Sequence, residues 1–173
     1  GELNMVPAAE AGNLQAWEGD DDITVYSQPA YNFDWLYVGG TQGDEPTREA
    51  LNQVEVRQAI GYAVDRTEIV DAAYFGYAEP DDDMLTDQFA APLVEFVDDQ
   101  DEFDLDVFPV EADPEEAQSL LEEAGYTGFD IEITHRPQAS QARASQVVQD
   151  NLSSVDGFGE VTLNQLDAAT FAN

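Results

Sequence analysis

The residues best suited to contact a polar solute form one short stretch, His135-Arg136-Pro137-Gln138, which contains the only histidine of the chain. The stretch follows an alternating apolar segment directly and precedes a helical one. We therefore expect it at the carboxyl end of a strand, where open α/β sheets bind their ligands. The competing interpretation, which stays open here, is that His135 is an ordinary loop residue.

A second group of such residues, Tyr31, Asn32, Phe33 and Trp35, lies at an expected turn between two strands. Aromatic side chains at such a place can line an apolar ligand cleft, although aromatic residues also dominate hydrophobic cores. The candidate ligand-binding residues from the two groups are Tyr31, Asn32, Trp35, His135, Arg136 and Gln138.

Catalytic and metal-binding patterns find little support. The chain has no cysteine, no glycine-rich phosphate loop and no Gly-x-Ser-x-Gly nucleophile motif, and its carboxylate pairs are too frequent to mark an acid–base pair. The aspartates at 81–83 and at 98, 101 and 104 lack the central glycine of a calcium loop. We therefore expect no enzyme, no cofactor and no metal site, and a solvated surface at these aspartates.

The charge of the chain is its most unusual property. Asp and Glu number 38 against 5 Lys and Arg, the net charge is −33, and every cation is an arginine. The acidic residues are spread among periodic apolar positions, which is not typical of a disordered acidic tail, although a partner of positive charge remains an alternative. In molar salt the Debye length falls to about 3 Å, so such a surface no longer opposes folding. The composition favours a halophilic protein and excludes nucleic acid as a partner.

The apolar pattern predicts alternating helices and strands. Helices are expected over 8–18, 56–64, 65–76, 113–125 and 141–152, with Asp167 capping one more, and strands over 3–6, 23–26, 33–38, 129–134 and 161–163. The helix expected over 65–76 has an Asp65-x-x-Glu68 capping box and Gly76 as its terminator. This order predicts an α/β fold, an open mixed sheet flanked by helices, within one domain over 1–173. Residues 77–112 fit no element, and we expect them to form a long excursion that packs elsewhere in a larger protein.

Three segments together resemble the family 5 extracellular solute-binding proteins, which bind dipeptides, oligopeptides or nickel. They are Val56-Arg57-Gln58-Ala59-Ile60-Gly61-Tyr62-Ala63-Val64-Asp65-Arg66, then Asp113-Pro114-Glu115-Glu116-Ala117-Gln118-Ser119-Leu120-Leu121-Glu122-Glu123-Ala124-Gly125-Tyr126, and the opening Gly1-Glu2-Leu3-Asn4-Met5. The resemblance implies one lobe of a bilobed, type II periplasmic-binding-protein-like clamshell from a halophilic archaeon. Arg57 and Arg66 of the first segment could bind a solute carboxylate, but arginines of such a motif on a helix more often have structural roles, in which they pair with local carboxylates and helix ends.

By the same resemblance, the complete protein would be the lipid-anchored, extracellular component of an ABC importer. It would close on a peptide-like solute and deliver it to permease subunits. No apolar run reaches the roughly 18 residues of a membrane span, so a signal and an anchor would lie outside this sequence, unless the chain is intracellular. Two alternatives from other classes remain: a halophilic hydrolase domain that uses paired carboxylates, and a protein-interaction domain.

Overall fold

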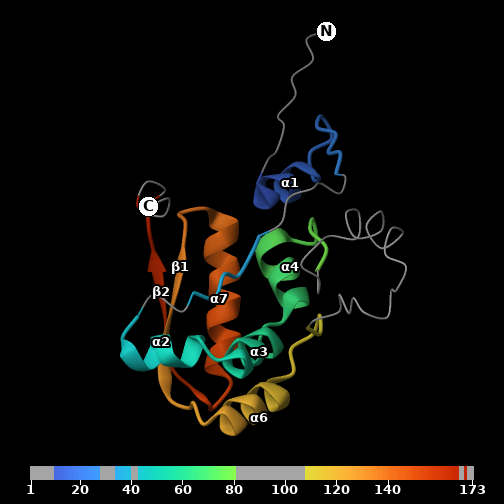
Figure 1. The fold of residues 1–173 in the computed structure, drawn as a ribbon. Coiled ribbons are helices and arrows are strands. Elements are labelled where there is room, and N and C mark those ends of the chain that lie inside the picture. Colours follow the sequence, from blue (N-terminus) through green and yellow to red (C-terminus); the bar gives the residue numbers. More distant parts are fainter. Residues whose placement is uncertain (1–9, 28–33, 40–42, 81–107, 168–169, 171–173) are drawn as a thin grey trace, which may run out of the picture.

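The computed structural model describes residues 10–27, 34–39, 43–80, 108–167 and 170. The helices and strands in these ranges are, in chain order, α1 (Ala11–Trp17), α2 (Glu45–Leu51), α3 (Val54–Ala63), α4 (Arg66–Tyr74), α6 (Pro114–Ala124), β1 (Phe129–His135), α7 (Ala139–Ser153) and β2 (Phe158–Gln165). Figure 1 shows their arrangement.

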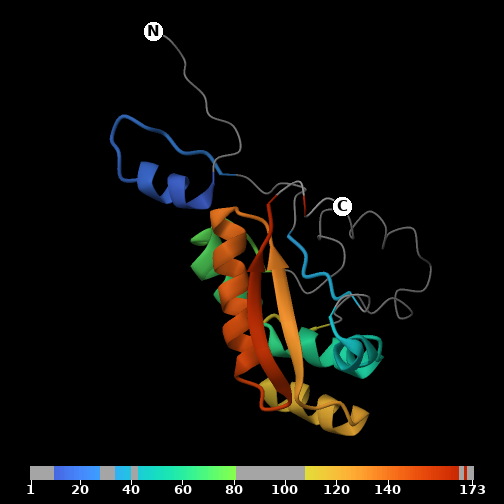
Figure 2. The same cartoon turned by 90° about the vertical axis from the view of Figure 1, so that its left-hand side faces the viewer.

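The two strands form a parallel pair connected through α7. Their register aligns Phe129 with Phe158 at one end and His135 with Gln165 at the other, with an irregularity between Phe129 and Ile131. Figure 2 shows α7 on one face of this pair, and α2 with the segment 34–39 on the other. The predicted α/β class is confirmed. The antiparallel strand that a mixed sheet requires is not among the described residues.

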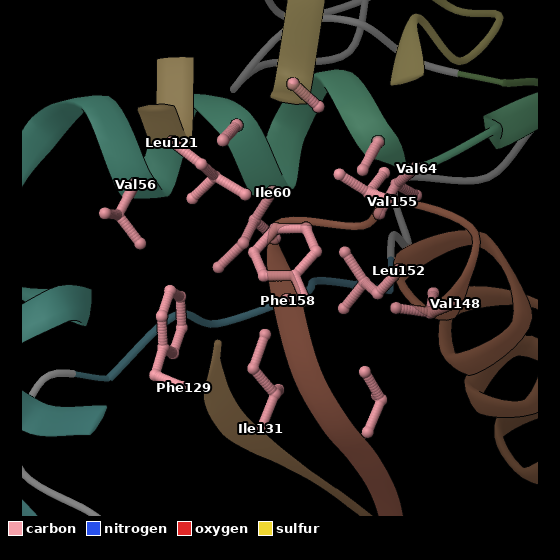
Figure 3. Packing of buried hydrophobic residues seen from close by; sticks show 14 of the residues in the cluster. Val56, Ile60, Val64, Leu121, Phe129, Ile131, Val148, Leu152, Val155 and Phe158 are labelled. Atoms are coloured by element: carbon pink, nitrogen blue, oxygen red, sulfur yellow. The ribbon is translucent and has the colours of Figure 1, made fainter. Parts of the chain in front are cut away.

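The hydrophobic core lies where α3, α6 and α7 meet the sheet (Figure 3). Strand β1 alternates strictly between buried and exposed residues, as its sequence predicts. At the amino ends of the strands, the rings of Phe129 and Phe158 meet edge to face with their centroids 5.7 Å apart. Leu121 of α6 and Leu152 of α7 are fully buried beside them, so apolar burial fixes the position of the helices on the sheet.

The helix ends follow the capping residues of the sequence closely. Helix α6 begins after Asp113, whose carboxylate accepts a hydrogen bond of 3.0 Å from the Glu116 backbone N–H, and it ends at Gly125, whose φ of 72° is left-handed. Helix α4 begins after Asp65, which caps the Glu68 N–H at 2.8 Å. It ends at Phe75, one residue before the predicted terminator, and both residues are left-handed, Phe75 with a φ of 54° and Gly76 with a φ of 78°.

Two predicted strands are wrong. Residues 23–26, and the described part of 33–38, have no regular secondary structure. Residues 23–26 alternate in sequence and 33–38 are mostly apolar, but a strand also needs hydrogen-bonded neighbours, and none pairs with these segments among the described residues. The predicted edge strand over 3–6 lies outside the described residues.

Helix α2 is absent from the sequence prediction. Asp44 caps it by accepting a hydrogen bond of 3.0 Å from the Thr47 N–H, and this bond lowers the pKa of the Asp44 carboxyl below its ordinary value. Pro46 occupies the first turn. The same signals predicted α6 correctly, but α2 buries only the small residues Thr47 and Ala50, so its apolar stripe is weak.

The last residues of the predicted excursion over 77–112 pack against the turn that connects α3 to α4. The Arg66 N–H donates to the Val110 carbonyl at 2.9 Å, and the Asp113 N–H donates to the Tyr62 carbonyl at 2.7 Å. Phe108 packs edge to face on Tyr62, with ring centroids 5.9 Å apart. Residues 108–113 are therefore part of the described core layer, whereas 81–107 lie outside the described residues.

Candidate functional site

The candidate site lies at the edge of the sheet where both strands end. His135 pairs with Gln165 there, and the Leu166 N–H donates to the His135 carbonyl at 3.0 Å, which holds the two strand ends together. Arg136, Pro137 and Gln138 follow β1 directly, and all three are exposed. Because β1 and β2 are parallel, the segments that follow them both start at the carboxyl end of the sheet. This is the position that the sequence predicts for ligand contacts.

His135 is the last residue of β1 and not a loop residue. It occupies the fourth buried position of the alternating strand, on the same face as Ile131 and Ile133, and only 8% of it is exposed. Its Nδ1 lies 2.8 Å from the Arg136 carbonyl oxygen. The imidazole is thus mostly enclosed by the protein, and the exposed polar groups of this stretch are those of Arg136 and Gln138.

Gln138 precedes α7 as its N-cap residue. Its backbone is extended, with φ −88° and ψ 138°, and its side chain makes no capping hydrogen bond. The amide of Gln138 is therefore exposed beside the first turn of α7, where the unpaired backbone N–H groups of the helix also point outward. Donors in such a place favour a negatively charged or carbonyl-bearing solute.

Asp34, the neighbour of Trp35 in the sequence, is held against α4 and α7. The Gln141 Nε2 in the first turn of α7 donates to Asp34 Oδ1 at 3.3 Å, and the Tyr74 hydroxyl at the end of α4 donates to Asp34 Oδ2. Trp35 itself is 62% exposed. Trp35 is therefore next in sequence to a residue that is bonded to the first turn of α7, while the other aromatic candidate, Tyr31, and Asn32 lie outside the described residues.

The Tyr74 hydroxyl is held in its neutral form. Burial of the ring, together with the hydrogen bond to Asp34, raises the pKa of Tyr74 above its ordinary value. Tyr74 therefore keeps its proton to a higher pH than an exposed tyrosine does, and its neutral hydroxyl donates to Asp34.

Arg143 fixes the end of α4 against α7. Its Nη2 donates to the Ala73 carbonyl at 3.0 Å, and its guanidinium lies 4.9 Å from the centre of the Phe75 ring. Phe75 is the residue in the left-handed conformation that ends α4. The guanidinium therefore braces the turn that presents Tyr74 to Asp34.

Asn151 joins the other end of α4 to α7. Its Oδ1 accepts from the Asp65 N–H at 2.9 Å, and its Nδ2 donates to Glu68 Oε2 at 3.0 Å. The expected capping box is therefore only half formed within α4, since Asn151 takes the place that the Glu68 carboxylate has in a complete box. The two helices are connected at both ends, which makes the pair a firm support for Asp34.

Arg57 and Arg66 contact backbone carbonyls, in accordance with structural roles. The Arg57 Nη1 donates to the Leu51 carbonyl at 3.0 Å. The Arg66 Nη1 lies 2.9 Å from the Pro109 carbonyl oxygen, with the carbonyls of Gly61 and Val64 also within reach. Both guanidinium groups stabilise turns around α3.

A separate, open depression of about 550 Å³ lies at the amino end of α4, away from the candidate site, and is lined by Asp65, Thr67, Glu68, Asp71, Ala72 and Glu111. Within the described part of the chain, no group of three or more His, Asp or Glu residues is arranged to hold a metal ion. None of the described helices is long and apolar enough to cross a membrane. The depression is a solvated acidic surface.

Comparison with known proteins identifies the family. The profile of the bacterial extracellular solute-binding proteins, family 5 (Middle), matches residues 1–173. The chain belongs to this family. The resemblance carried by the sequence motifs is confirmed, and the family is one of solute-binding proteins.

Similar proteins bind several kinds of solute. The chain is 33% identical to the nickel-binding periplasmic protein of Escherichia coli over 72% of its length, and 26% identical to the dipeptide-binding protein of the same organism over 79%. Its fold is similar to that of the binding protein AgaA from A. tumefaciens, solved in complex with agropinic acid, with a TM-score of 0.53, 30% identity, and coverage of 67% of this chain and 22% of AgaA. The chain spans only 25% and 22% of the two curated relatives.

Sequence reasoning names Trp35, Arg136 and Gln138 as candidates, but it misses the contacts that hold Asp34, the neighbour of Trp35. The contact joins Asp34, Tyr74 and Gln141, which lie up to 107 residues apart in the sequence. Local residue spacing does not predict such a contact. The sequence gives only a weak indication that Arg143 has a structural role. It is one of just five cationic residues in the chain, and it lies on the same expected helix as Gln141.

Proposed function

We propose that this chain is part of the solute-binding component of an ABC importer, which captures a peptide-like solute outside the cell and delivers it to permease subunits. The match of the family profile over residues 1–173 carries the proposal. The candidate site is of the appropriate kind, because an exposed tryptophan, an arginine and an amide beside a helix amino end suit a solute with an apolar part and a carboxylate.

The mechanism we propose is hinge closure of two lobes, of which this chain supplies one wall. A solute stabilises the closed state only by its greater affinity for that state than for the open one. The exposed contacts Trp35, Arg136 and Gln138 would meet the solute on one side, and the remaining polypeptide would meet it on the other. Tyr31 and Asn32 are proposed as further contacts, and His135 as the buried support of this wall.

The setting of the complete protein is part of the same proposal. A lipid anchor would hold it at the outer face of the membrane of a halophilic archaeon, close to the permease. Residues 77–112 would form an excursion that packs on another part of the larger protein. The net charge of −33 supports the halophilic setting, since concentrated salt screens it.

A thermal-shift panel on the complete gene product tests the proposal. In 3 M KCl, dipeptides, longer peptides and a nickel–histidine complex are added separately, and a solute that binds the folded state raises the melting temperature with its concentration. We expect peptides to raise it. No shift with any peptide at millimolar concentration contradicts a peptide-binding role, and a shift with the nickel complex alone reassigns the solute.

The hydrolase alternative is tested on the same sample. We expect no turnover of peptides, esters or phosphoesters in high salt. Saturable hydrolysis that disappears when one acidic pair is replaced by its amides overturns the assignment as a binding protein.

A further inference from the structure

The Asp34 carboxylate is the only part of the segment 34–39 for which the described hydrogen bonds give partners on two different helices. One oxygen accepts from the Tyr74 hydroxyl of α4, and the other accepts from the Gln141 amide of α7. Within the described residues each oxygen has one donor, and each donor belongs to a helix that is itself packed in the fold. Figure 1 shows this segment leaving the region of α4 and α7 and running towards α2.

The two donors are themselves fixed. Arg143 braces the end of α4 through the Ala73 carbonyl and the Phe75 ring, and Asn151 connects the start of α4 to α7. Tyr74 is the last residue of α4, and Gln141 lies in the first turn of α7. The distance between these two donors is therefore set by the packing of the helix pair and not by the segment that they hold.

The segment itself has no strand ladder to fix it. Residues 34–39 are irregular, and three consecutive large side chains are exposed, Trp35 at 62%, Leu36 at 47% and Tyr37 at 89%. At its far end Val38 is half-buried against the core. Trp35 is thus placed between a polar attachment at Asp34 and an apolar one at Val38.

We propose that Asp34 is a positioning residue for solute binding: by joining Tyr74 and Gln141, it holds Trp35 beside Arg136 and Gln138 at the carboxyl edge of the sheet. The inference rests on the proposed function only in taking Trp35 as a solute contact. The attachment of Trp35 through Asp34 is a separate claim that needs no ligand.

The attachment is tested first without ligand. Trp17 and Trp35 are the two tryptophans of the chain, so Trp17→Phe leaves Trp35 as the only indole fluorophore. Acrylamide is the suitable quencher, because it is neutral and the charge of −33 would repel iodide. In this background we expect Tyr74→Phe and Asp34→Ala each to raise the quenching constant and to lower the anisotropy of Trp35. Asp34→Asn keeps one acceptor oxygen and should give intermediate values.

The matched control is Tyr126→Phe, which removes another tyrosine hydroxyl. Its partner is the Gln53 amide at 3.4 Å, on elements other than α4 and α7. We expect this variant to leave Trp35 unchanged. Gln141→Leu gives an independent second test if Asp34→Ala fails to fold, as judged by circular dichroism. Folded Tyr74→Phe and Gln141→Leu variants with unchanged quenching and anisotropy overturn the attachment.

The functional part is tested by peptide titration of the complete gene product. We expect Asp34→Ala to weaken binding by about tenfold, comparable to the loss of one aromatic contact. Because Asp34 is proposed to act through Trp35, the double variant with Trp35→Ala should bind no more weakly than Trp35→Ala alone. Full affinity in Asp34→Ala, or additive losses in the double variant, overturns the positioning role. If the unmodified protein binds no peptide, the proposed function fails while the fluorescence result still decides the attachment.

Discussion

Arginine side chains in this protein mainly support the backbone. Arg48, Arg57, Arg66 and Arg143 each donate to a backbone carbonyl at 2.9–3.0 Å. A planar guanidinium with five donors can satisfy the carbonyls left free where helices end, which a carboxylate cannot do. In a chain with 38 acidic residues, these few cations therefore supply donors to backbone carbonyls, whereas aspartates such as Asp44 and Asp65 accept from backbone N–H groups at the same turns.

Tyr74 gives the first prediction, which concerns alkaline pH. Its folded pKa is raised above the ordinary value of 10.0, so the folded state holds the phenolic proton more tightly than the unfolded state does. The stabilising contribution of the neutral Tyr74 hydroxyl is fully present below pH 10. It declines as the pH rises from 10 towards the folded pKa of Tyr74. Urea unfolding from pH 8 to pH 11.5, at constant high salt, should show the difference between wild type and Tyr74→Phe shrinking above pH 10.

Tyr126→Phe is the comparison for this series, because it removes a hydroxyl whose partner is an amide and not a carboxylate. The difference in free energy of unfolding between wild type and Tyr126→Phe should not show the decline above pH 10 that is expected for Tyr74→Phe. A Tyr74→Phe difference that stays constant or grows between pH 10 and pH 11.5 contradicts the raised pKa.

At the scale of the elements, the approach of α6 to the start of β2 is unusually close. Gly157 is buried between α7 and β2, and a Cβ added there would lie 2.5 Å from Leu121 Cδ1 and 3.2 Å from its Cβ. Leu121 is fully buried, so it has little room to withdraw. The glycine is therefore needed for space at the contact between these two elements.

We predict that Gly157→Ala lowers the free energy of unfolding by about 1–3 kcal/mol, the usual range for overpacking a filled core. Gly19→Ala is the matched control, because Gly19 also lies in a turn and the nearest atom to its added Cβ is the Ala16 carbonyl oxygen at 3.9 Å. That change should be neutral or stabilising by less than about 1 kcal/mol. Urea unfolding measures both, and equal stabilities would show that Leu121 yields without cost.

The elements also show how far sequence reasoning extends. Asp113, Pro114 and Gly125 define α6 at both ends, and the alternation over 129–134 defines β1, because these signals act within one element. The strand predicted over 33–38 failed because a largely apolar, aromatic-rich run favours a buried strand but does not specify the hydrogen-bonded partner that a strand requires. His135 was within reach, since the alternating pattern continues to it and predicts a buried side chain. The contact of Asp34 with Gln141 could not be predicted in this way, because the two residues are 107 positions apart in the sequence.

For the whole molecule, the net charge of −33 predicts a strong dependence on salt. Repulsion among the carboxylates opposes the compact state, and the Debye length falls from about 10 Å at 0.1 M to about 3 Å at 1 M salt. The melting temperature should therefore be much higher in 3 M than in 0.1 M KCl. Equal melting temperatures would contradict the halophilic interpretation.

The central claim is that this chain supplies one wall of a solute cleft that another part of the protein completes. A pocket normally buries about 70–90% of a small ligand, which one wall cannot do. The 173-residue chain should then bind a peptide with at best millimolar affinity, about −4 kcal/mol, while the complete gene product binds it far more tightly.

Isothermal titration calorimetry of both proteins, with one peptide in the same 3 M KCl, measures this difference most directly. We predict a large loss of affinity in the 173-residue chain, with any remaining weak binding reduced further by Arg136→Ala and Trp35→Ala. Equal affinity in the two proteins would place the whole site within these 173 residues and contradict the two-lobed cleft.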